Sequence, residues 1–294
     1  MNRVLITGSP RSGTTPIGAI VDKFHKSRVF YEPFHPHHGH IKISEWYVGE
    51  DAKEIDSIIE DIHCLKPCLK KGIRVSDSMF ITSIKSVLGA RSNFTRIKTK
   101  LFIKPDDTFV LKDPTAVFLS KKMIEFHNYK VLATVRNPFS TAASHKRKDW
   151  MSGDYSRFLD KDFLGIGKYR REYNTGNAAI RIAILWRLIY SYISTLEERC
   201  MIINVDQFAQ NPLGEVREIA RFLDKQVTEP VTDILGKLYV SEEKKVEKTH
   251  DFVRNPQQLV TDWKSELNPD EIDFVQECCG DLWGKLNSSK VKAI

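Results

Sequence analysis

The sequence predicts an α/β fold in which a central parallel β-sheet is flanked by helices. Short apolar runs alternate along the chain with longer segments of helical periodicity, and this alternation is typical of parallel sheets covered on both faces. Hydrophobic residues make up 41% of the 294 residues, which supports a sizeable core and argues against disorder. Each candidate functional motif follows the end of an expected strand, where open α/β sheets bind their ligands.

Five apolar runs are the expected strands. The first, "RVLITG", is a short buried run that ends in glycine, and "DTFVLKDP" stops at a polar tip. The other three runs have the same apolar character and similar length. The strands are expected at 3–8, 27–33, 107–114, 129–138 and 200–208.

The helices are recognised from their first residues and from their periodicity. Pro16 lies in the first turn of one expected helix, where its missing N–H costs little. Asn137 is a good N-cap, and Pro138 follows it at the first helical position. In the longest helix, apolar residues recur at steps of three and four positions. Helices are expected at 14–26, near 53–63, at 115–128, 137–150, about 177–199, 211–224 and near 269–283.

Charge and cysteine content narrow the classes of function. Lys and Arg number 45 against 38 Asp and Glu, and the net charge of +7 suits an anionic ligand, nucleic acid or a membrane surface equally. No aromatic residues interleave with the basic stretches, so nucleic acid is not an expected partner. The five cysteines are irregularly spaced and predict neither a disulfide framework nor a zinc site.

The chain is expected to be a soluble, cytoplasmic protein. No apolar run approaches about 18 residues, so no membrane span is expected. Functional sequence begins at residue 4, which leaves no room for a signal peptide. Neither repeats nor linkers interrupt the pattern, so we expect a single domain over 1–294, with insertions at about 33–100 and 150–176.

The N-terminal stretch "GSPRSGTT" predicts a phosphate-binding loop between a strand and a helix. Gly8 and Gly13 allow a tight turn into the helix, whose N-terminal N–H groups and positive dipole end attract anions. Thr14 and Thr15 add hydroxyl donors. Thr14 also stands where the P-loop G-x-x-x-x-G-K-[ST] has its lysine, and Arg11 lies inside the loop instead. The missing lysine disfavours ATP hydrolysis, and Arg11 suits a 5′-phosphate whose outer group is not a γ-phosphate.

The segment "SPRSGTT" resembles the 5′-phosphosulfate-binding loop of the sulfotransferases, a family with a P-loop-kinase-like, three-layer α/β fold. The resemblance implies transfer of a sulfuryl group from 3′-phosphoadenosine 5′-phosphosulfate (PAPS), with 3′-phosphoadenosine 5′-phosphate (PAP) as the product. In having an arginine, the loop resembles that of the carbohydrate and tyrosylprotein branch of the family. The resemblance further implies a soluble, bacterial-type member of this branch. The implied 5′-phosphosulfate-binding residues are Ser9, Pro10, Arg11, Ser12, Gly13, Thr14 and Thr15.

A second stretch, "VRNPFSTAAS", resembles the 3′-phosphate site of the same family. Arg136 ends an expected strand, and Ser144 follows eight residues later in the next helix. The resemblance implies that this pair binds the 3′-phosphate, which ATP lacks. The family often has Arg-Asp-Pro, whereas here Asn137 follows the arginine and still caps the helix.

Two further stretches imply the catalytic groups. Lys112 in "VLKDP" matches a Lys-Asp-Pro motif and is implied, with Arg11, to stabilise charge on the leaving phosphate. Glu32 in "FYEPF" matches the family's general base, which takes the proton of the acceptor hydroxyl. Pro33 is expected to hold the backbone of Glu32 extended. Asp113 is expected to cap the next helix rather than to act in catalysis.

The resemblance is looser in the C-terminal part. The stretch "KVEKTHDFVRNP" lies where relatives close over the nucleotide, and Lys248 and Arg254 are candidates for nucleotide binding. Trp186 and Trp263 are expected in the core rather than against adenine.

The stretch "HPHHGH" contains four histidines, His35, His37, His38 and His40. We expect it to line the acceptor site rather than to bind a metal. No carboxylate or cysteine is placed in the sequence to complete a metal site, and adjacent histidines point apart.

The sequence therefore predicts a PAPS-dependent sulfotransferase that acts, without a metal, on a hydroxyl group of a sugar or glycolipid. A nucleotide-dependent kinase is the alternative enzyme, but it needs Mg²⁺, and only Arg11 replaces the Walker lysine. A catalytically silent nucleotide- or glycan-binding module is the alternative from another class, against which Glu32 argues.

Overall fold

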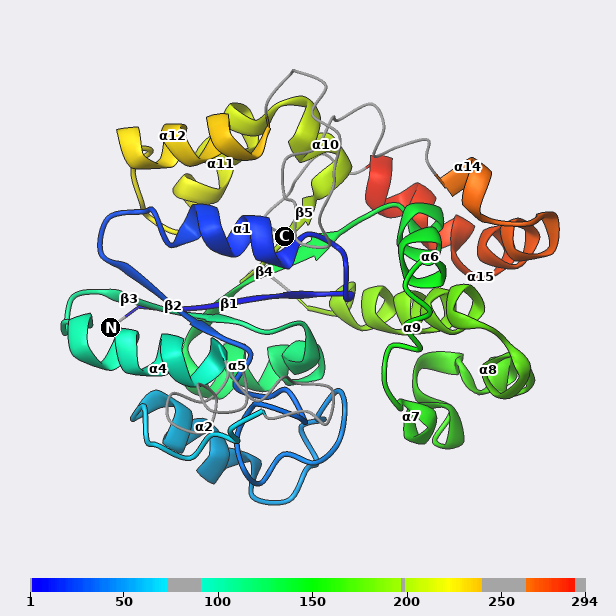
Figure 1. Ribbon diagram of the computed structural model, residues 1–294, viewed down its shortest axis with the longest axis horizontal. Coiled ribbons are helices and arrows are strands. Elements are labelled where there is room, and N and C mark those ends of the chain that lie inside the picture. Colours follow the sequence, from blue (N-terminus) through cyan, green and yellow to red (C-terminus); the bar gives the residue numbers. More distant parts are fainter. Residues whose placement is uncertain (1, 73–90, 197–198, 240–262, 289–294) are drawn as a thin grey trace, which may run out of the picture. The chain divides into compact units, whose positions relative to one another are not determined.

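The computed structural model describes residues 2–72, 91–196, 199–239 and 263–288 (Figure 1). By its internal contacts the chain divides into two compact units. Unit 1 comprises Met1–Thr7 and Lys26–Val131, and unit 2 comprises Gly8–His25 and Leu132–Ile294. Glu32 and Lys112 therefore belong to unit 1, whereas the glycine-rich loop belongs to unit 2. The single domain expected from the sequence stays a prediction.

Five strands form a central sheet in the order β2-β3-β1-β4-β5, and β3 pairs in parallel with both β1 and β2. The predicted α/β class, a central parallel sheet flanked by helices, is confirmed. The later strands end earlier than their apolar runs because Asp113, Asn137 and Asn204 cap the helices that follow. The strands are β1 (Arg3–Gly8), β2 (Ser27–Tyr31), β3 (Thr108–Lys112), β4 (Tyr129–Val135) and β5 (Cys200–Asn204).

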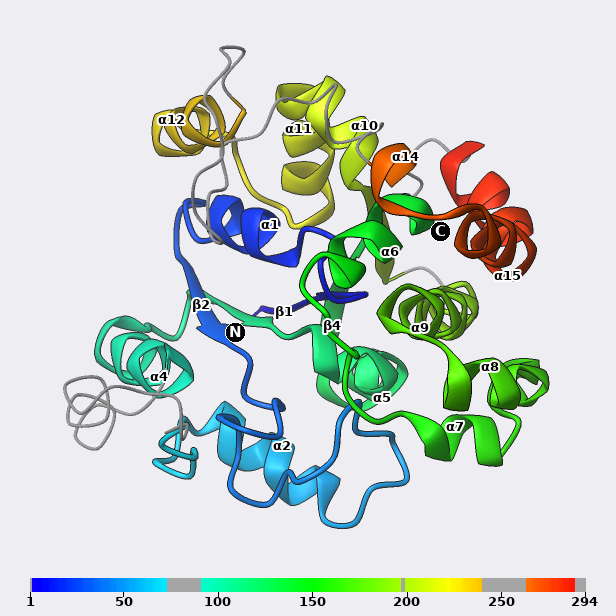
Figure 2. The same cartoon turned by 45° about the vertical axis from the view of Figure 1, so that its right-hand side comes forward.

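Helix α4 is the main unpredicted element of unit 1, and it lies along β2 (Figures 1 and 2). The Tyr31 N–H donates to Thr95 Oγ1 at 3.2 Å, and the Arg91 guanidinium lies 4.2 Å from the centre of the Tyr31 ring. The buried residues of α4 are polar, so its sequence shows no apolar periodicity. The helices of unit 1 are α2 (Ile55–His63), α4 (Arg91–Phe102), the 3₁₀ helix η1 (Pro114–Leu119) and α5 (Ser120–His127).

Helix α9 (Ala178–Ile193) is largely buried, and α6 and α15 pack against it (Figures 1 and 2). Asn177 caps it by accepting from the N–H groups of Ala179 and Ile180. The other helices are α1 (Thr14–Val21), α6 (Pro138–Lys146), α7 (Ser156–Asp160), η2 (Phe163–Gly165), η3 (Gly167–Tyr169), α8 (Arg170–Thr175), α10 (Val205–Gln210), α11 (Pro212–Phe222), α12 (Glu229–Leu238), α14 (Trp263–Glu266) and α15 (Pro269–Ser288).

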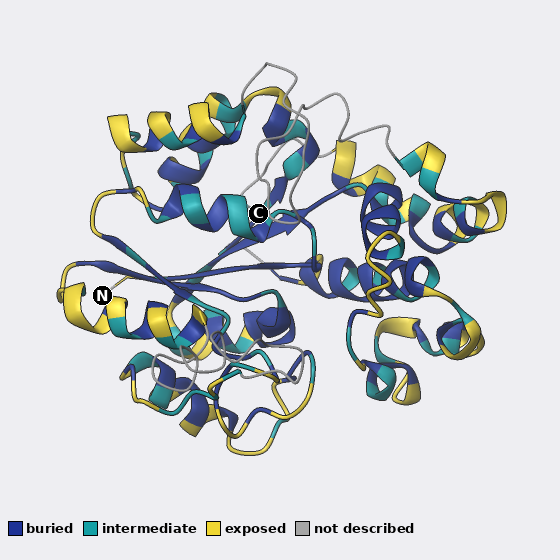
Figure 3. Cartoon of the chain, in the orientation of Figure 1, coloured by how far each residue is buried: buried dark blue, intermediate teal, exposed yellow. Residues whose placement is uncertain are grey.

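Burial follows the predicted pattern in the regular elements. Figure 3 shows the strands, α6 and α9 as largely buried, whereas α4 and α12 each keep an exposed face. The helix expected at 14–26 ends at Val21, where Asp22 forms the C-cap. Within the described ranges, no helix is long and apolar enough to cross a membrane.

Candidate active site

The glycine-rich loop runs from the end of β1 to Gly13, the N-cap of α1. Gly8 has a φ of 139°, and a Cβ at this position would lie 2.3 Å from the carbonyl oxygen of Thr134. Only glycine therefore fits here. Arg11 also has a positive φ, 67°, which is uncommon for a residue with a side chain. The turn presents the first N–H groups of α1, which have no intrahelical acceptor and suit an anion.

Two fully buried serines hold the loop in shape from inside. Ser12 Oγ donates to the Ser9 carbonyl at 2.6 Å and lies 2.7 Å from Thr134 Oγ1. The Ser9 N–H donates to the Tyr190 hydroxyl at 3.2 Å, and that hydroxyl donates to the Thr134 carbonyl at 2.7 Å. Burial raises the pKa of Tyr190, so the hydroxyl keeps the proton that it donates. These bonds preorganise the loop. The contacts expected between residues 9–15 and the nucleotide stay predictions.

Arg11 reaches from the loop to helix α6. Its Nε donates to Ser144 Oγ at 3.1 Å, across 133 positions of the sequence. Ser144 is nearly buried, with 7% of its surface exposed. The fold of unit 2 thus brings together a residue expected at the 5′-phosphosulfate and a residue expected at the 3′-phosphate.

Arg136 leaves the end of β4 in a nearly buried position, with 8% of its surface exposed. Its carbonyl accepts from the indole N–H of Trp186 at 3.0 Å, and its Nε lies 3.9 Å from Asp206 Oδ1. Asp206 also accepts from the Asn137 N–H at 2.8 Å. Burial raises the pKa of Asp206, although the Arg136 guanidinium opposes this shift. Helices α9 and α10 therefore hold Arg136 in place.

His145 supports the loop from α6. Its Nε2 lies 3.4 Å from the Pro10 carbonyl oxygen, and its ring stacks on Trp150 with 4.9 Å between ring centres. Burial lowers the pKa of His145 to about 4, so the ring is neutral at pH 7. A neutral ring adds no positive charge to the loop, so its contribution is to position the Pro10 peptide.

Glu32 and Lys112 form a close ion pair in unit 1. Tyr31 lies opposite Lys112 in the parallel pairing of β2 and β3, which brings both residues to the same strand ends. The Glu32 N–H donates to the Lys112 carbonyl at 2.8 Å, and Lys112 Nζ lies 2.5 Å from Glu32 Oε1. The Lys112 side chain is 3% exposed and that of Glu32 is 27% exposed.

The charge of Glu32 is set by its surroundings. Burial raises the pKa of Glu32, but the Lys112 ammonium and a hydrogen bond from His38 outweigh burial, so this pKa lies well below its usual range. Glu32 is therefore ionised at neutral pH, which is the state that a proton acceptor needs.

The backbone conformation expected for Glu32 is wrong. Its φ is 51°, in the left-handed region, and not extended. The Glu32 N–H is bonded to the Lys112 carbonyl, and the Glu32 carbonyl accepts from the His35 N–H at 3.3 Å. These contacts on both sides of the residue outweigh the extended preference that Pro33 imposes locally.

A family model described as the sulfotransferase domain matches residues 1–287. The chain belongs to the sulfotransferase family. It is therefore an enzyme that transfers a sulfuryl group, and the P-loop-kinase-like fold implied by its N-terminal loop is confirmed. No curated protein matches the sequence.

Solved sulfotransferase structures align with nearly the whole chain at low identity. The sulfotransferase domain from the curacin biosynthetic pathway is 15% identical, with 96% of this chain and 97% of that chain covered and a TM-score of 0.46. The sulfotransferase domain from the Synechococcus PCC 7002 olefin synthase is 14% identical, with 94% of each chain covered and a TM-score of 0.43. A mouse sulfotransferase complexed with PAP is 14% identical, with 97% and 87% covered and a TM-score of 0.47. At these values, membership of the family rests on the family model alone.

In this sulfotransferase, Asp113 has the predicted structural role. Its Oδ1 accepts from the Thr115 N–H at 2.9 Å and caps η1. Its Oδ2 accepts from the Phe34 N–H at 2.7 Å, so the same side chain anchors the loop after Glu32. Burial, and then the Glu32 carboxylate, raise the pKa of Asp113 to about 6 despite these hydrogen bonds.

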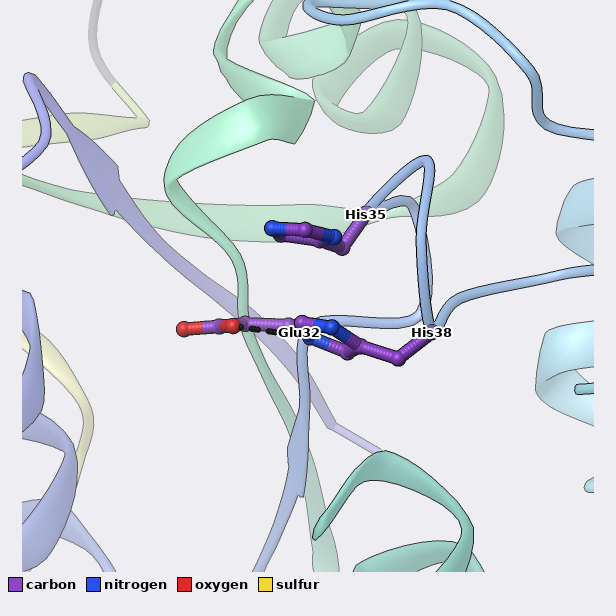
Figure 4. Close-up of side chains that lie close together, drawn as sticks. All are labelled: Glu32, His35 and His38. Carbon is purple, nitrogen blue, oxygen red and sulfur yellow. Dashed lines mark hydrogen bonds and ion pairs between the residues drawn. The ribbon is translucent and has the colours of Figure 1, made fainter. Parts of the chain in front are cut away.

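The histidine-rich loop differs from its prediction. Figure 4 shows His35 and His38 stacked beside Glu32. The ring centres of His35 and His38 are 3.7 Å apart, and His38 Nε2 lies 3.1 Å from Glu32 Oε2. The expectation that no carboxylate is placed to complete a cluster is therefore wrong. The reversal of the loop after Glu32 brings the three side chains to one place.

The remaining predicted residues are the two tryptophans and the two C-terminal candidates for nucleotide binding. Trp186 is fully buried, as expected, whereas Trp263 is only half-buried and stacks on Phe139 with 4.6 Å between ring centres. Lys248 and Arg254, the candidates for closing over the nucleotide, lie outside the described residues.

Sequence reasoning missed several residues that position the site. Tyr190 lies in the apolar stripe of α9, so only its hydroxyl distinguished it from a core residue. Asp206 lies within the run expected as a strand at 200–208, so its contact with Arg136 could not be predicted from the local sequence. His145 directly follows Ser144, but nothing in the local sequence indicates its burial or its contact with Pro10.

Proposed function

We propose that this sulfotransferase transfers a sulfuryl group from PAPS to a hydroxyl group of a carbohydrate or glycolipid. The observation that carries the proposal is the hydrogen bond between Arg11 and Ser144. It links the anion-binding loop to the residue matched with the 3′-phosphate site. PAPS, unlike ATP, carries phosphates at both its 5′ and 3′ positions, so it suits this combination.

Unit 2 is proposed to bind the donor. The N–H groups at the start of α1 and the Arg11 guanidinium suit the 5′-phosphosulfate. The Arg136 guanidinium and the Ser144 hydroxyl suit the 3′-phosphate. Ser144 Oγ accepts a hydrogen bond from Arg11, so its own hydroxyl proton can be donated to a phosphate oxygen.

Glu32 in unit 1 is proposed to be the general base. The donor supplies an activated sulfuryl group on a phosphate leaving group. As the acceptor oxygen bonds to sulfur, the bond from sulfur to the bridging oxygen breaks, and its electron pair stays on the phosphate. The hydroxyl proton passes to Glu32, and the positive charges of Lys112 and Arg11 stabilise the leaving phosphate.

Lys112 is proposed to change partners during this reaction. Its ammonium lies 2.5 Å from Glu32 Oε1 and keeps the carboxylate ionised. If Lys112 turns toward the leaving phosphate, Glu32 loses its nearest positive charge and the pKa of Glu32 rises. The carboxylate then becomes a stronger base at the step where it takes the proton.

The class of acceptor rests on two observations. Arginine at position 11 resembles the loop of the carbohydrate and tyrosylprotein branch. In unit 1, the half-buried Trp46 lies 4.8 Å from the ring centre of His35 and 5.5 Å from that of His37. A flat aromatic surface beside polar imidazoles suits a polar ring such as a sugar.

The five free thiols suit the reducing cytoplasm, which we propose as the compartment.

Ligand-dependent stability and an acceptor screen test this function. PAP at a hundredfold excess over its Kd is expected to stabilise the fold by about 2.7 kcal/mol, and Mg·ATP at the same concentration by much less. Labelled PAPS is then offered with a panel of sugars, glycolipids, phenols and tyrosine peptides. Stronger stabilisation by Mg·ATP would favour the kinase, and PAP binding without transfer to any acceptor would favour the silent module.

A further inference from the structure

We propose that Glu32, His35 and His38 form a binding site for a divalent cation of the zinc class, and that its occupation inhibits sulfuryl transfer. The three side chains offer two imidazole nitrogens and one carboxylate oxygen, and these ligand atoms all lie within 4.8 Å of one another (Figure 4). Two histidines and a carboxylate suit zinc and its first-row neighbours, and leave at least one coordination position open.

The spacing of the ligand atoms fits a single ion. His38 Nε2 lies 3.1 Å from Glu32 Oε2. Two ligands bound about 2.0–2.2 Å from a tetrahedral zinc ion are roughly 3.4 Å apart, so a small movement admits the ion. The His35 and His38 rings are stacked at 3.7 Å with 17° between their planes.

The loop that carries the ligands is folded tightly on itself. The Gly39 N–H donates to the His35 carbonyl, and the His40 N–H donates to the Pro33 carbonyl, both at 2.7 Å. A side chain at Gly39 would place its Cβ 2.4 Å from the Pro33 carbonyl oxygen, so this approach needs glycine. The backbone between the ligands is therefore held before any ion binds.

The rest of unit 1 anchors the same loop. The Phe34 N–H donates to Asp113, and Ser92 Oγ donates to the His38 carbonyl, each at 2.7 Å. Trp46 packs edge-on against His35 with 4.8 Å between ring centres. Ligands held on such a framework lose little freedom on binding, which favours affinity.

His40, Asp61 and Cys68 form a second group with suitable ligand atoms. His40 Nδ1 accepts from the Lys42 N–H at 3.2 Å, and its Nε2 lies 3.3 Å from Asp61. Asp61 also accepts from Lys66 at 2.6 Å. Both histidine nitrogens and the carboxylate thus have protein partners, and this group serves as an internal control.

Binding of an ion at the proposed site is opposed by contacts that the site already makes, and this opposition can be tested. The ion replaces the hydrogen bond from His38 to Glu32. The Lys112 ammonium, 2.5 Å from the other Glu32 oxygen, also repels a dication. Removing the charge of Lys112 is therefore expected to tighten zinc binding.

Inhibition follows from the identity of one ligand. A carboxylate bound to zinc is withdrawn from proton transfer, so an occupied site leaves the acceptor hydroxyl without its base. This consequence rests on the proposed function of Glu32, whereas the binding of the ion does not.

Zinc binding is measured on the full chain, without nucleotide or acceptor, by competition with a chromophoric chelator. We expect one equivalent of Zn²⁺ to bind and Mg²⁺ not to compete. His38→Gln and His35→Gln each remove a ligand and are expected to weaken binding by more than the roughly 10- to 100-fold that loss of a partner behind a ligand causes. The exposed neighbour His37→Gln and the second group's Asp61→Asn are expected to bind zinc as the wild type does, and thermal melting checks that each variant is folded.

Two results overturn the site: no stoichiometric zinc binding, or loss of binding in Asp61→Asn but not in His38→Gln. Wild-type protein titrated with Co²⁺ gives a second measurement that needs no variant. Strong d–d absorption bands of a low-symmetry site are expected, and a spectrum of hexaaquo Co²⁺ alone would also overturn it. Lys112→Gln is expected to bind zinc more tightly, and weaker binding counts against the charge argument.

The inhibitory role is tested with labelled PAPS and an acceptor. Zinc is expected to lower turnover over the same concentration range in which it binds, and EDTA is expected to restore turnover. If zinc binds stoichiometrically and turnover does not fall, the inhibitory role is overturned, but the binding site is not. If no acceptor is sulfated at all, the proposed function fails, while the zinc titration still decides the site.

Discussion

Replacement of Glu32 separates its proposed role in catalysis from its role in stability. Glutamine is nearly isosteric and still accepts a hydrogen bond from Lys112, but it takes no proton. General-base catalysis typically contributes about 10²–10⁴-fold, so kcat of Glu32→Gln is expected to fall by that factor. The affinity for PAP is expected to change little, because Glu32 is not among the residues proposed to contact the nucleotide.

The structure also sets the size of the stability effect. Glu32→Ala leaves the ammonium of Lys112, 3% exposed, without its carboxylate. Breaking a buried ion pair costs about 3–5 kcal/mol, and the 27% exposure of Glu32 places the expected loss near the lower end, at about 3 kcal/mol. Glu32→Gln keeps a hydrogen-bond acceptor and is expected to lose about 1–2 kcal/mol.

A matched control is available in the same unit. The ion pair between Lys42 and Glu54 has side chains that are 40% and 50% exposed, so Glu54→Ala is expected to cost at most about 1 kcal/mol. Urea denaturation measures the free energies of unfolding, and labelled PAPS measures turnover on an accepted substrate. Near-normal turnover of Glu32→Gln would refute the general base. Equal destabilisation by Glu32→Ala and Glu54→Ala would refute the argument from the buried ion pair.

Four further outcomes are expected. Arg136→Ala should raise the Kd for PAP by roughly 10- to 150-fold, since a charge-assisted contact worth about 1.5–3 kcal/mol is lost, and unchanged affinity would exclude this residue from the site. Gly8→Ala should destabilise the fold by more than about 1 kcal/mol in urea, because its φ is 139° and its Cβ would lie 2.3 Å from the Thr134 carbonyl oxygen. The pKa of Asp113 is raised from 3.8 to about 6. The protonated side chain therefore stabilises the fold fully below pH 4, and about 3 kcal/mol of stability is lost as the pH rises through 6. Asp113→Asn should remove this pH dependence from the free energy of unfolding measured between pH 4 and 7. EDTA should leave turnover undiminished, and a loss that zinc reverses would make the metal a cofactor.

Much of the fold and the glycine-rich loop could be predicted from the sequence, because their signals lie in consecutive residues. Hydrophobic runs mark the five strands, and Asn137 followed by Pro138 marks the start of α6. Gly8 and Gly13 mark the turn into α1, since the backbone angles they adopt disfavour other residues. Helix α4 was not predicted, because its buried face is polar and its sequence therefore lacks the apolar periodicity that indicates a helix.

The contacts that give these residues their chemistry depend on tertiary structure. Arg11 meets Ser144 across 133 positions, and Glu32 meets Lys112 across 80, because strand pairing and helix packing bring distant segments together. The left-handed backbone of Glu32 and its gathering with His35 and His38 run against local preferences. Burial and neighbouring charge, which set the protonation of Glu32 and Asp113, exist only once the chain has folded, so no short stretch of sequence encodes them.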